Sequence, residues 1–485
     1  MCFKKILFSV FCVCFAASLQ GQELVWADLE QDAKKHLINL INIDTSQPEG
    51  NEINAVRYVY KVLNRHKIDW EIYRPEKSRA SISAVIKGSD KTLKPLMLLA
   101  HLDTVAPSGT WKYPPIKATE ENGRIYGLGS SDAKNFAAIY LAFFTWIKRN
   151  NITPKRDIIL LLTADEESGS SKGLSWVMNS PRWKKLKPGY AINEGGSVII
   201  EEGSVPLIFV EGATKMYMDI KITAAGTAGH SSMGASGNNA VYNLSQALSK
   251  IEQLRMPYVL TPVTRSFFEQ ISHIQNEDGK TTIELLLGGS KSESDMAAEI
   301  ISGDNFFKTQ LQDTITPTII SAGNEVTSTS SEATAILNCR LLPSTEPDEF
   351  VSRITKLFEG DENISIEVLE KPKMPAPPFP DGGDDLFSSI VLSGQEVFEG
   401  SITLLGMTPA SSDSEFLRRE GIIAYGIGAP ADVREIDGHS HSADEHVELS
   451  DFFKHLKFSS NIIYSFAVGG YLSDREIKES AEETN

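Results

Sequence analysis

Cysteine is scarce in this sequence, positive charge is outnumbered, and no internal repeat is present. The four cysteines, Cys2, Cys12, Cys14 and Cys339, are too few in a chain of this length for a small disulfide-stabilised fold. Lys and Arg total 47 against 64 Asp and Glu, which gives a net charge of -17. The electrostatic field of this negative charge repels phosphate backbones and anionic lipid surfaces, so we expect no nucleic-acid partner.

The one long apolar run lies at the N-terminus. Lys4 and Lys5 precede an apolar stretch over residues 6–19, which is too short to span a bilayer and has the form of a secretory signal. We expect a signal peptide over 1–22 and an exported, periplasmic or secreted protein with no membrane anchor after cleavage; an uncleaved anchor is the alternative. Because this segment carries two Lys and no acid, its removal shifts the net charge from -17 to -19 and leaves Cys339 as the only thiol.

The length of 485 residues, of which 41% are hydrophobic, suggests a globular chain of two or three domains. Short apolar runs bounded by turn or acidic residues lie at 96–100, 158–163, 190–192 and 422–427. Such continuous runs are typical of strands buried on both faces, and helical stretches such as 135–148 separate them. The alternation predicts an α/β domain with a mostly parallel sheet covered by helices, formed by residues 23–213 and 372–485.

The pattern changes at about residue 214. Apolar and polar residues alternate over 216–222, as in a strand with one face toward water, and a helix begins near Asn239. Further strands are predicted at 333–342 and 364–369. This order predicts a smaller α+β domain over 214–371, inserted into the first domain and possessing helices on one face of an open sheet.

Ionisable residues follow the predicted buried strands directly. His101 and Asp103 follow the first strand, Glu166 and Glu167 the second, and Glu194 the third. The carboxyl ends of parallel strands converge on one crevice, so we expect these side chains to meet. Grouped carboxylates repel one another, and a cation is the simplest way to keep them ionised. His and carboxylate ligands without thiolate suit zinc, with manganese or cobalt as alternatives.

Several short motifs contain these residues and occur in a fixed order along the chain. They are AHLDTV at 100–105, GLGSSDAK at 127–134, ADEESGS at 164–170, NEGG at 193–196 and HSADE at 441–445. With these motifs the chain resembles the M20 family of metallopeptidases, which includes aminoacylase, succinyl-diaminopimelate desuccinylase and carnosine dipeptidases. The resemblance covers essentially the whole mature chain, and the inserted domain falls where this family carries its lid, or dimerisation, domain.

The resemblance implies a pair of metal ions. His101, Asp132 and Glu194 would bind one ion, and Asp132, Glu167 and His441 would bind the other, so that Asp132 is shared. We expect two divalent ions, zinc in the first place. Their combined effect on a shared water is to lower its pKa toward neutrality.

The resemblance also implies roles for residues that bind no metal. Glu166 would be the general base, which takes a proton during attack on an amide carbonyl and returns it to the leaving amine. Asp103 would orient His101. His230 would stabilise the oxyanion, often from a neighbouring subunit; alternatively, it caps the helix that begins near Asn239. Asn324 and Arg340 would hold the carboxylate of the substrate.

Some positions depart from the family pattern or leave a choice open. Leu128 stands where many members have Arg, and Asn193 stands where several have Asp, which would weaken the site if position 193 were the ligand. His439 and His446 compete with His441 for the last ligand position, although the spacing from Glu445 favours His441. The segment 256–320 is longer than a minimal lid needs, which leaves the oligomeric state open.

Three other functions compete with a metallopeptidase of this kind. Residues 169–173, GSSKG, fit the nucleophile elbow of serine hydrolases, but the same stretch completes the acidic motif. The M28 aminopeptidases use similar ligands, and an inactive M20-like binding module would keep the fold alone. We expect instead a hydrolase that cleaves an amide next to a free carboxylate in short peptides or N-acyl amino acids. A homodimer through the lid domain is one of the oligomeric states left open.

Overall fold

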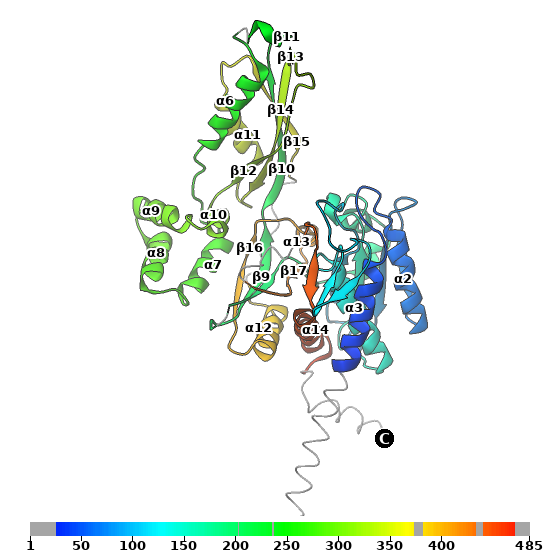
Figure 1. Ribbon diagram of the computed structural model, residues 1–485. Helices are drawn as coiled ribbons and strands as arrows, with labels where there is room; N and C mark the ends of the chain where they lie inside the picture. The colour runs from blue at the N-terminus through cyan, green and yellow to red at the C-terminus, as the bar shows by residue number, and fades with distance from the viewer. Residues whose placement is uncertain (1–25, 202, 235–236, 373–381, 433–439, 471–485) are drawn as a thin grey trace, which may run out of the picture. The chain divides into compact units, whose positions relative to one another are not determined.

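The computed structural model describes residues 26–201, 203–234, 237–372, 382–432 and 440–470. The chain divides into two compact units (Figure 1): one comprises Met1–Glu211, Pro380–Leu404 and Ser412–Asn485, the other Gly212–Phe379 and Leu405–Ser411. The expected signal peptide at 1–22 lies outside the described residues. In the part of the chain that is described, no helix has the length and apolar character needed to cross a membrane.

The first unit is built on a large sheet whose central strands are parallel. Its order is β1-β2-β6-β3-β7-β17-β9-β8-β18, with β16 beside β9. The parallel centre consists of β6 (Ile158–Thr163), β3 (Leu96–His101), β7 (Tyr190–Asn193) and β17 (Ile423–Gly426). The outer strands are β1 (Trp70–Tyr73), β2 (Ser81–Ile86), β8 (Ser197–Ile200), β9 (Leu207–Thr214), β16 (Ile402–Thr408) and β18 (Pro430–Asp432). The predicted α/β fold with a mostly parallel sheet is confirmed.

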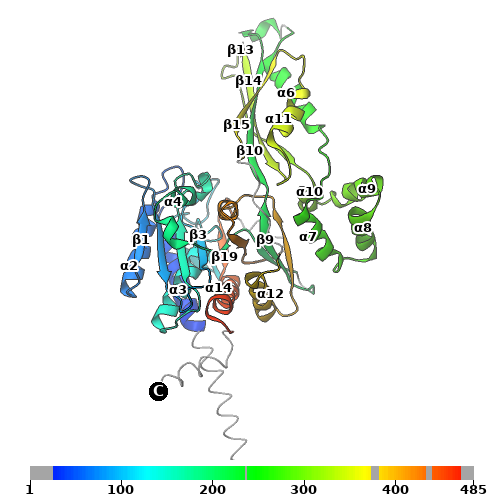
Figure 2. The ribbon, with the colours of Figure 1, turned by 180° about the vertical axis from the view of Figure 1, so that it is seen from behind.

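Helices cover both faces of this sheet, which explains why β3 and β6 are buried throughout. On one face, α4 (Leu174–Met178) and α13 (Ser414–Arg419) pack against Met97 and Leu99 of β3. On the other, α3 (Lys134–Arg149) packs on β3 and β6, and α14 (Leu449–Ile463) packs on α3. Figures 1 and 2 view the two sides. Further helices are 26–41, α2 (Glu52–Arg65), α5 (Trp183–Leu186) and α12 (Asp385–Val397).

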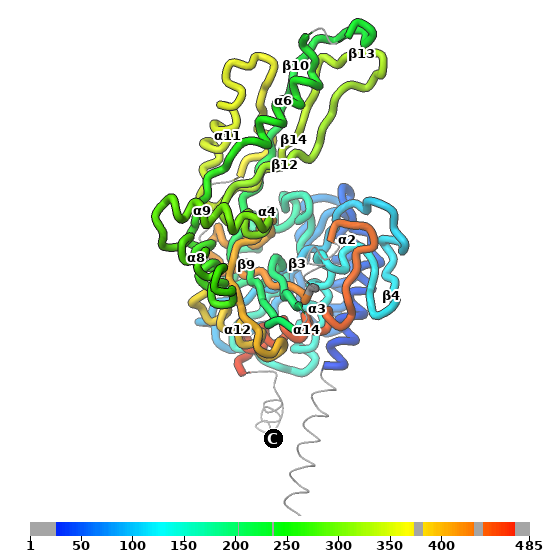
Figure 3. The backbone as a smooth tube through the Cα atoms, turned by 60° about the vertical axis from the view of Figure 1, so that its left-hand side comes forward, coloured from blue at the N-terminus to red at the C-terminus, as the bar shows by residue number. Residues whose placement is uncertain are grey.

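The second unit contains an antiparallel sheet that is covered on one face. Its order is β12 (Thr314–Ala322), β14 (Glu332–Leu341), β10 (Met216–Ala225) and β15 (Ile364–Glu370). Alternate residues of β10 and β14 are buried and pack against α6 (Ala240–Glu252) and α11 (Pro347–Lys356). Figure 3 shows α6 running along β10 and β14. The role of this unit as a lid or dimerisation domain stays a prediction.

The segment after residue 256, which the sequence suggested was a long polar connection, folds largely into helices. These are α7 (Pro262–Ser272), α8 (Glu277–Gly288), α9 (Lys291–Ile301) and α10 (Asn305–Leu311). Thr261 and Ser290 begin α7 and α9 with capping boxes. The cap of α9 could have been predicted from the sequence, since Ser290 stands three residues before Glu293.

Candidate metal centre

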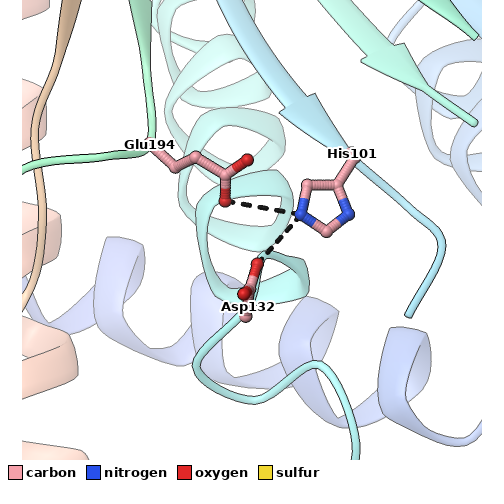
Figure 4. Close-up of side chains that lie close together, drawn as sticks. All are labelled: His101, Asp132 and Glu194. Atoms are coloured by element: carbon pink, nitrogen blue, oxygen red, sulfur yellow. Dashed lines mark hydrogen bonds and ion pairs between the residues drawn. The ribbon is translucent and has the colours of Figure 1, made fainter. Parts of the chain in front are cut away.

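Three predicted ligands converge at the carboxyl edge of the central strands. His101 is the last residue of β3, Glu194 follows β7, and Asp132 lies just before α3 (Figure 4). The His101 Nε2 atom lies 2.9 Å from Asp132 Oδ1 and 3.4 Å from Glu194 Oε2. One ligand atom from each residue lies within 4.8 Å of the others, a spacing suited to a common cation.

A second group of three shares Asp132 with the first. His441 Nε2 lies 3.3 Å from Asp132 Oδ2 and 3.1 Å from Glu167 Oε2. One ligand atom from each of these three residues also lies within 4.8 Å of the others. The two oxygens of Asp132 therefore face two different imidazoles, which is the arrangement a bridging carboxylate requires.

The Glu166–Glu167 pair is held on a single short turn. A 3-10 helix (Glu166–Ser168) follows β6 directly, and Asp165 before it has a left-handed backbone with φ of 65°. The Asp165 carboxylate accepts a hydrogen bond from the Lys172 N–H at 2.8 Å, which closes the loop after this turn. Adjacent glutamates on one turn leave the strand in different directions, so one can bind metal while the other stays free.

Asp103 organises this turn as well as His101. The His101 Nδ1 atom lies 2.9 Å from the backbone carbonyl oxygen of Asp103 and 3.6 Å from its carboxylate. The carboxylate oxygens accept hydrogen bonds from the N–H groups of Glu166 and Glu167, both at 3.1 Å. The carbonyl group of Asp103 thus lies closer to the imidazole than the expected carboxylate, which instead holds the glutamate turn.

The acids of the cluster are crowded together and partly buried. Burial raises the pKa of Glu194 to about 7, and Asp132 adds to the rise while His101 opposes it. Burial also raises the pKa of Glu167, and that of Glu166 rises well above its usual range. Carboxyls that resist ionisation when crowded are the groups whose charge a divalent cation compensates.

The two imidazoles are shifted in the opposite sense. Burial lowers the pKa of His101, but Glu194, Asp103 and Asp132 outweigh it and raise the pKa well above the usual range. Hydrogen bonds with Asp132 and Glu167 raise the pKa of His441 to about 10. Both shifts show that the surrounding carboxylates favour positive charge at these two imidazoles. The donor set of imidazole nitrogens and carboxylate oxygens fits zinc, cobalt or manganese.

The residues that competed with Glu194 and His441 as ligands lie in other surroundings or outside the described residues. Asn193 is buried and donates a hydrogen bond from Nδ2 to the Ser414 hydroxyl oxygen at 3.2 Å, so Glu194 supplies the carboxylate of the first group. The His446 ring lies tilted against Tyr126, with the ring centroids 5.0 Å apart, and its Nδ1 atom lies 2.9 Å from the Asp444 carbonyl oxygen. His439 lies outside the described residues.

Two acids beside the cluster were not assigned a role from the sequence. Glu445 accepts hydrogen bonds from the N–H and hydroxyl of Ser131 at 2.9 and 3.0 Å, and so anchors the backbone next to Asp132. Asp413 accepts hydrogen bonds from the hydroxyls of Ser170 and Thr163. The signal was present in both cases, since Glu445 belongs to the HSADE motif and Asp413 to the segment SSDS.

The remaining predicted site residues belong to the second unit. The Arg340 guanidinium donates to the Ser411 hydroxyl at 2.9 Å and to the Asn338 side-chain oxygen at 3.2 Å, and it lies 4.8 Å from the centroid of the Tyr217 ring. Within the described ranges, no carboxylate forms an ion pair with it. Burial lowers the pKa of Arg340, so this half-buried cation has only neutral direct partners.

His230 and Asn324 lie at the other end of the same unit. β11 (Gly229–His230) pairs with β13 (Ser328–Thr329), and Asn324 lies in the loop before β13. Arg340 instead pairs with Tyr217 near the start of β10, and the distance along β10 from Tyr217 to Ala225 is about 27 Å at about 3.4 Å per residue. The structure therefore does not bring Asn324 and Arg340 together within one second unit.

The alternative role for His230 was to cap the helix near Asn239. Asn239 caps α6 itself, because its side-chain oxygen accepts from the N–H groups of Val241 and Tyr242. His230 instead accepts from the Ser232 N–H at 3.2 Å and begins the 3-10 turn Ser231–Met233. Its side chain is exposed.

The chain resembles two curated enzymes over most of its length. It is 27% identical over 387 residues to an N-fatty-acyl-amino acid synthase/hydrolase of Mus musculus, covering 77% of this chain and 74% of that protein. It is 25% identical over 432 residues to a probable succinyl-diaminopimelate desuccinylase of Staphylococcus aureus, covering 88% of this chain and 96% of that protein.

Solved structures show the same fold. An M20 family metallo-carboxypeptidase from Sulfolobus solfataricus matches with a TM-score of 0.67 at 18% identity, over 89% of this chain and 98% of that one. A dinuclear metal-binding peptidase of the M20 family from Bacillus subtilis matches with a TM-score of 0.52 at 11% identity, over 90% and 97%. The family model for peptidase family M20/M25/M40 matches residues 97–465. The chain is therefore a hydrolase of the peptidase and amidohydrolase type and belongs to peptidase family M20/M25/M40.

Proposed function

We propose that this hydrolase uses two zinc ions to cleave an amide bond adjacent to a free carboxylate, in short peptides or N-acyl amino acids. The observation that carries this proposal is the pair of ligand groups joined at Asp132, with Glu166 beside them on the turn that also bears Glu167. The mouse N-fatty-acyl-amino acid synthase/hydrolase and the probable staphylococcal succinyl-diaminopimelate desuccinylase, which this chain resembles, support the substrate class.

The residues divide the chemistry between them. His101, Asp132 and Glu194 would hold one ion, and Asp132, Glu167 and His441 would hold the other. The ions, when bound, supply a polarising charge for the scissile carbonyl and lower the pKa of a shared water. Glu166 removes a proton from the attacking water and delivers it to the leaving nitrogen. Burial raises the pKa of Glu166, which strengthens this carboxylate as a proton acceptor.

Arg340 receives the substrate carboxylate. Its guanidinium already donates to neutral oxygens of Asn338 and Ser411 and lies against Tyr217, so its orientation is restricted. A planar donor held in this way suits a bidentate carboxylate. The absence of an acidic ion-pair partner among the described residues leaves its charge available for an anionic ligand.

A homodimer supplies the remaining groups. His230 and Asn324 lie beyond the Ala225 end of β10, which is about 27 Å along the strand from Tyr217, the partner of Arg340. This separation favours their action at the site of a second copy. β12 offers an edge for such pairing, because it is the outer strand of its sheet and Ile319 and Ile320 are exposed. The dimer and the export of the chain after cleavage near residue 22 are both part of the proposal.

The experiment that tests this function combines metal analysis with a substrate panel. The purified protein is expected to contain two zinc ions per chain and to hydrolyse N-acyl amino acids or dipeptides, whereas the matching carboxamides react poorly. Removal of metal by a chelator should abolish turnover, and zinc should restore it. Full activity of chelated, metal-free protein would refute the proposal, and equal rates on carboxamides would refute the carboxylate requirement.

A further inference from the structure

A buried arginine lies behind the glutamate turn, outside every motif singled out above. Arg79 precedes β2, and only 3% of its surface is exposed. Its Nη1 atom donates to Glu52 Oε1 at 2.6 Å and lies 3.5 Å from Asp165 Oδ1. Its Nη2 atom donates to Gln47 Oε1 and to the Pro48 carbonyl oxygen, both at 2.6 Å.

The backbone is shaped around this guanidinium. Gly50 has a positive φ of 68°, and a Cβ atom there would collide with the Arg79 side chain. Glu52 and Asp165 are both buried, so Arg79 neutralises carboxylates that water cannot reach. A buried cation is tolerated when its charge is matched by acceptors in this way. Such a network holds its members in one arrangement.

Two routes lead from Arg79 to the glutamate turn. The first passes through Gln47, whose Nε2 atom donates to Asp103 Oδ2 at 2.9 Å. Asp103 in turn accepts from the N–H groups of Glu166 and Glu167. The second route is direct, because Asp165 immediately precedes Glu166 in the chain.

We propose that Arg79 and Gln47 are positioning residues that fix the turn carrying Glu166 and Glu167, and thereby set the affinity of the second metal position and the rate of turnover. This inference rests on the proposed function for the roles of the two glutamates. Neither positioning residue touches the candidate ligands directly. Their effect passes through Asp103, which accepts hydrogen bonds from the backbone of the glutamate turn, and through Asp165, which immediately precedes that turn.

The test uses Gln47→Met, which keeps the length of the side chain and removes its acceptor and donor. Metal-free protein is titrated with Co²⁺ in a calorimeter. The affinity for the second Co²⁺ ion should be about 10- to 100-fold weaker than in the wild type, the range typical of groups that orient metal ligands. Turnover, kcat, should fall by a similar factor while KM stays within about twofold. Arg79→Lys keeps the charge but cannot contact all four oxygens, so it should produce the same pattern.

Arg156→Lys is the matched control. Arg156 is a buried arginine of the same unit that donates to the carbonyl oxygens of Phe466 and Lys94, near the opposite, amino end of β6. It should lower the melting temperature and leave the second Co²⁺ affinity unchanged.

Wild-type Co²⁺ affinity in both Gln47→Met and Arg79→Lys would overturn the inference, as would an equal loss of affinity in Arg156→Lys. If the wild type cleaves no member of the substrate panel while Gln47→Met still weakens the second Co²⁺ event, the proposed function fails and the positioning role is supported. If the wild type is active and both Gln47→Met and Arg79→Lys match it in kcat and in Co²⁺ affinity, the positioning role alone fails.

Discussion

The two units of this chain carry their charged residues in opposite settings. In the first unit, His101, Asp132 and Glu194 meet at the ends of strands buried on both faces. In the second, Arg340 lies on a strand whose alternate residues are only partly buried, among the neutral partners Asn338 and Ser411. The first setting crowds several acids around two imidazoles, whereas the second holds a cation that forms no ion pair with any described carboxylate.

Sheet architecture accounts for the difference. Helices on both faces of a parallel sheet leave only the strand ends open, so the reactive groups gather there and are desolvated together. An antiparallel sheet covered on one face leaves alternate side chains of every strand accessible. We therefore expect substitutions of the site acids in the first unit to abolish the chemistry. In the second unit, we expect substitution of Arg340 to change which substrates bind and substitution of His230 to reduce turnover.

The largest effect is expected from Glu166→Gln. Loss of the general base should lower kcat by about 10²- to 10⁴-fold, because a positioned base contributes that much. Metal content and melting temperature should stay near the wild-type values, since Glu166 is not in either ligand group. Steady-state kinetics and metal analysis check this, with Glu120→Gln as a surface control. A loss of less than about tenfold, or roughly 1.4 kcal/mol of barrier, would show that another group is the base.

The next effect separates two histidines of the same segment. His441→Ala should reduce bound metal from two ions to one and lower kcat by about 10²-fold or more, because it removes a ligand of the second group. His446→Ala should keep both ions and lower only the melting temperature, since His446 is buried against Tyr126. Metal analysis of the two proteins decides the matter, and the reverse result would make His446 the ligand.

The sequence was sufficient for the first unit because its signals are local. Each buried strand reads as an apolar run, and each ligand follows such a run within a few residues, so the parallel topology alone predicts that they converge. The bounds of β6 agree with the predicted range 158–163. The fold class and the family could therefore be derived before any coordinates, whereas the individual roles of the ligands stay predictions.

The sequence was insufficient where contacts join residues far apart in the chain. Arg79 and Gln47 belong to no motif, and their link to Asp103 exists only because the loop before α2 lies against the segment after β3. The His101 Nδ1 atom lies 2.9 Å from the Asp103 carbonyl oxygen and 3.6 Å from its carboxylate, a difference too small for the sequence to reveal. The helices of 262–311 were missed because a polar surface on a short helix resembles a loop when only composition is considered.

A smaller effect is expected in the second unit, from Arg340→Ala. KM for carboxylate substrates should rise about 10- to 100-fold, which corresponds to the roughly 1.5 to 3 kcal/mol of a charged hydrogen bond. kcat should change little, and carboxamide analogues should be affected far less. Arg353→Ala, in α11 of the same unit, serves as control. Equal losses on both substrate classes would mean that Arg340 stabilises the unit rather than binding the carboxylate.

Mixing two inactive variants tests whether the units of different copies cooperate. Glu166→Gln and His230→Ala each remove one group, so a mixed dimer would contain one intact site. Random exchange of subunits should restore about a quarter of the wild-type activity. The measurement is the rate after the two proteins are mixed and allowed to exchange, compared with each alone. No recovery in a mixture shown to contain mixed dimers would place His230 with its own chain.

The smallest effect is a pH dependence confined to the first unit. Burial raises the pKa of Glu194 from 4.5 to about 7, so the metal-free fold loses stability as the pH rises through that window. Hydrogen bonds with Asp132 and Glu167 raise the pKa of His441 from 6.5 to about 10, so its contribution is complete below pH 6.5 and is lost as the pH rises toward 10. Because of both pKa shifts, the metal-free protein loses stability as the pH rises from 5 to 8, whereas in the loaded protein bound cations take the place of these protons.

The melting temperature of zinc-loaded protein should therefore exceed that of chelated protein by a margin that grows by a few °C over this range. Titration of groups remote from the site, such as His36 and His455, affects the zinc-loaded and chelated proteins equally and so cancels in this difference. A margin that stays constant or shrinks as the pH rises would show that the two ligand groups do not bind the metal.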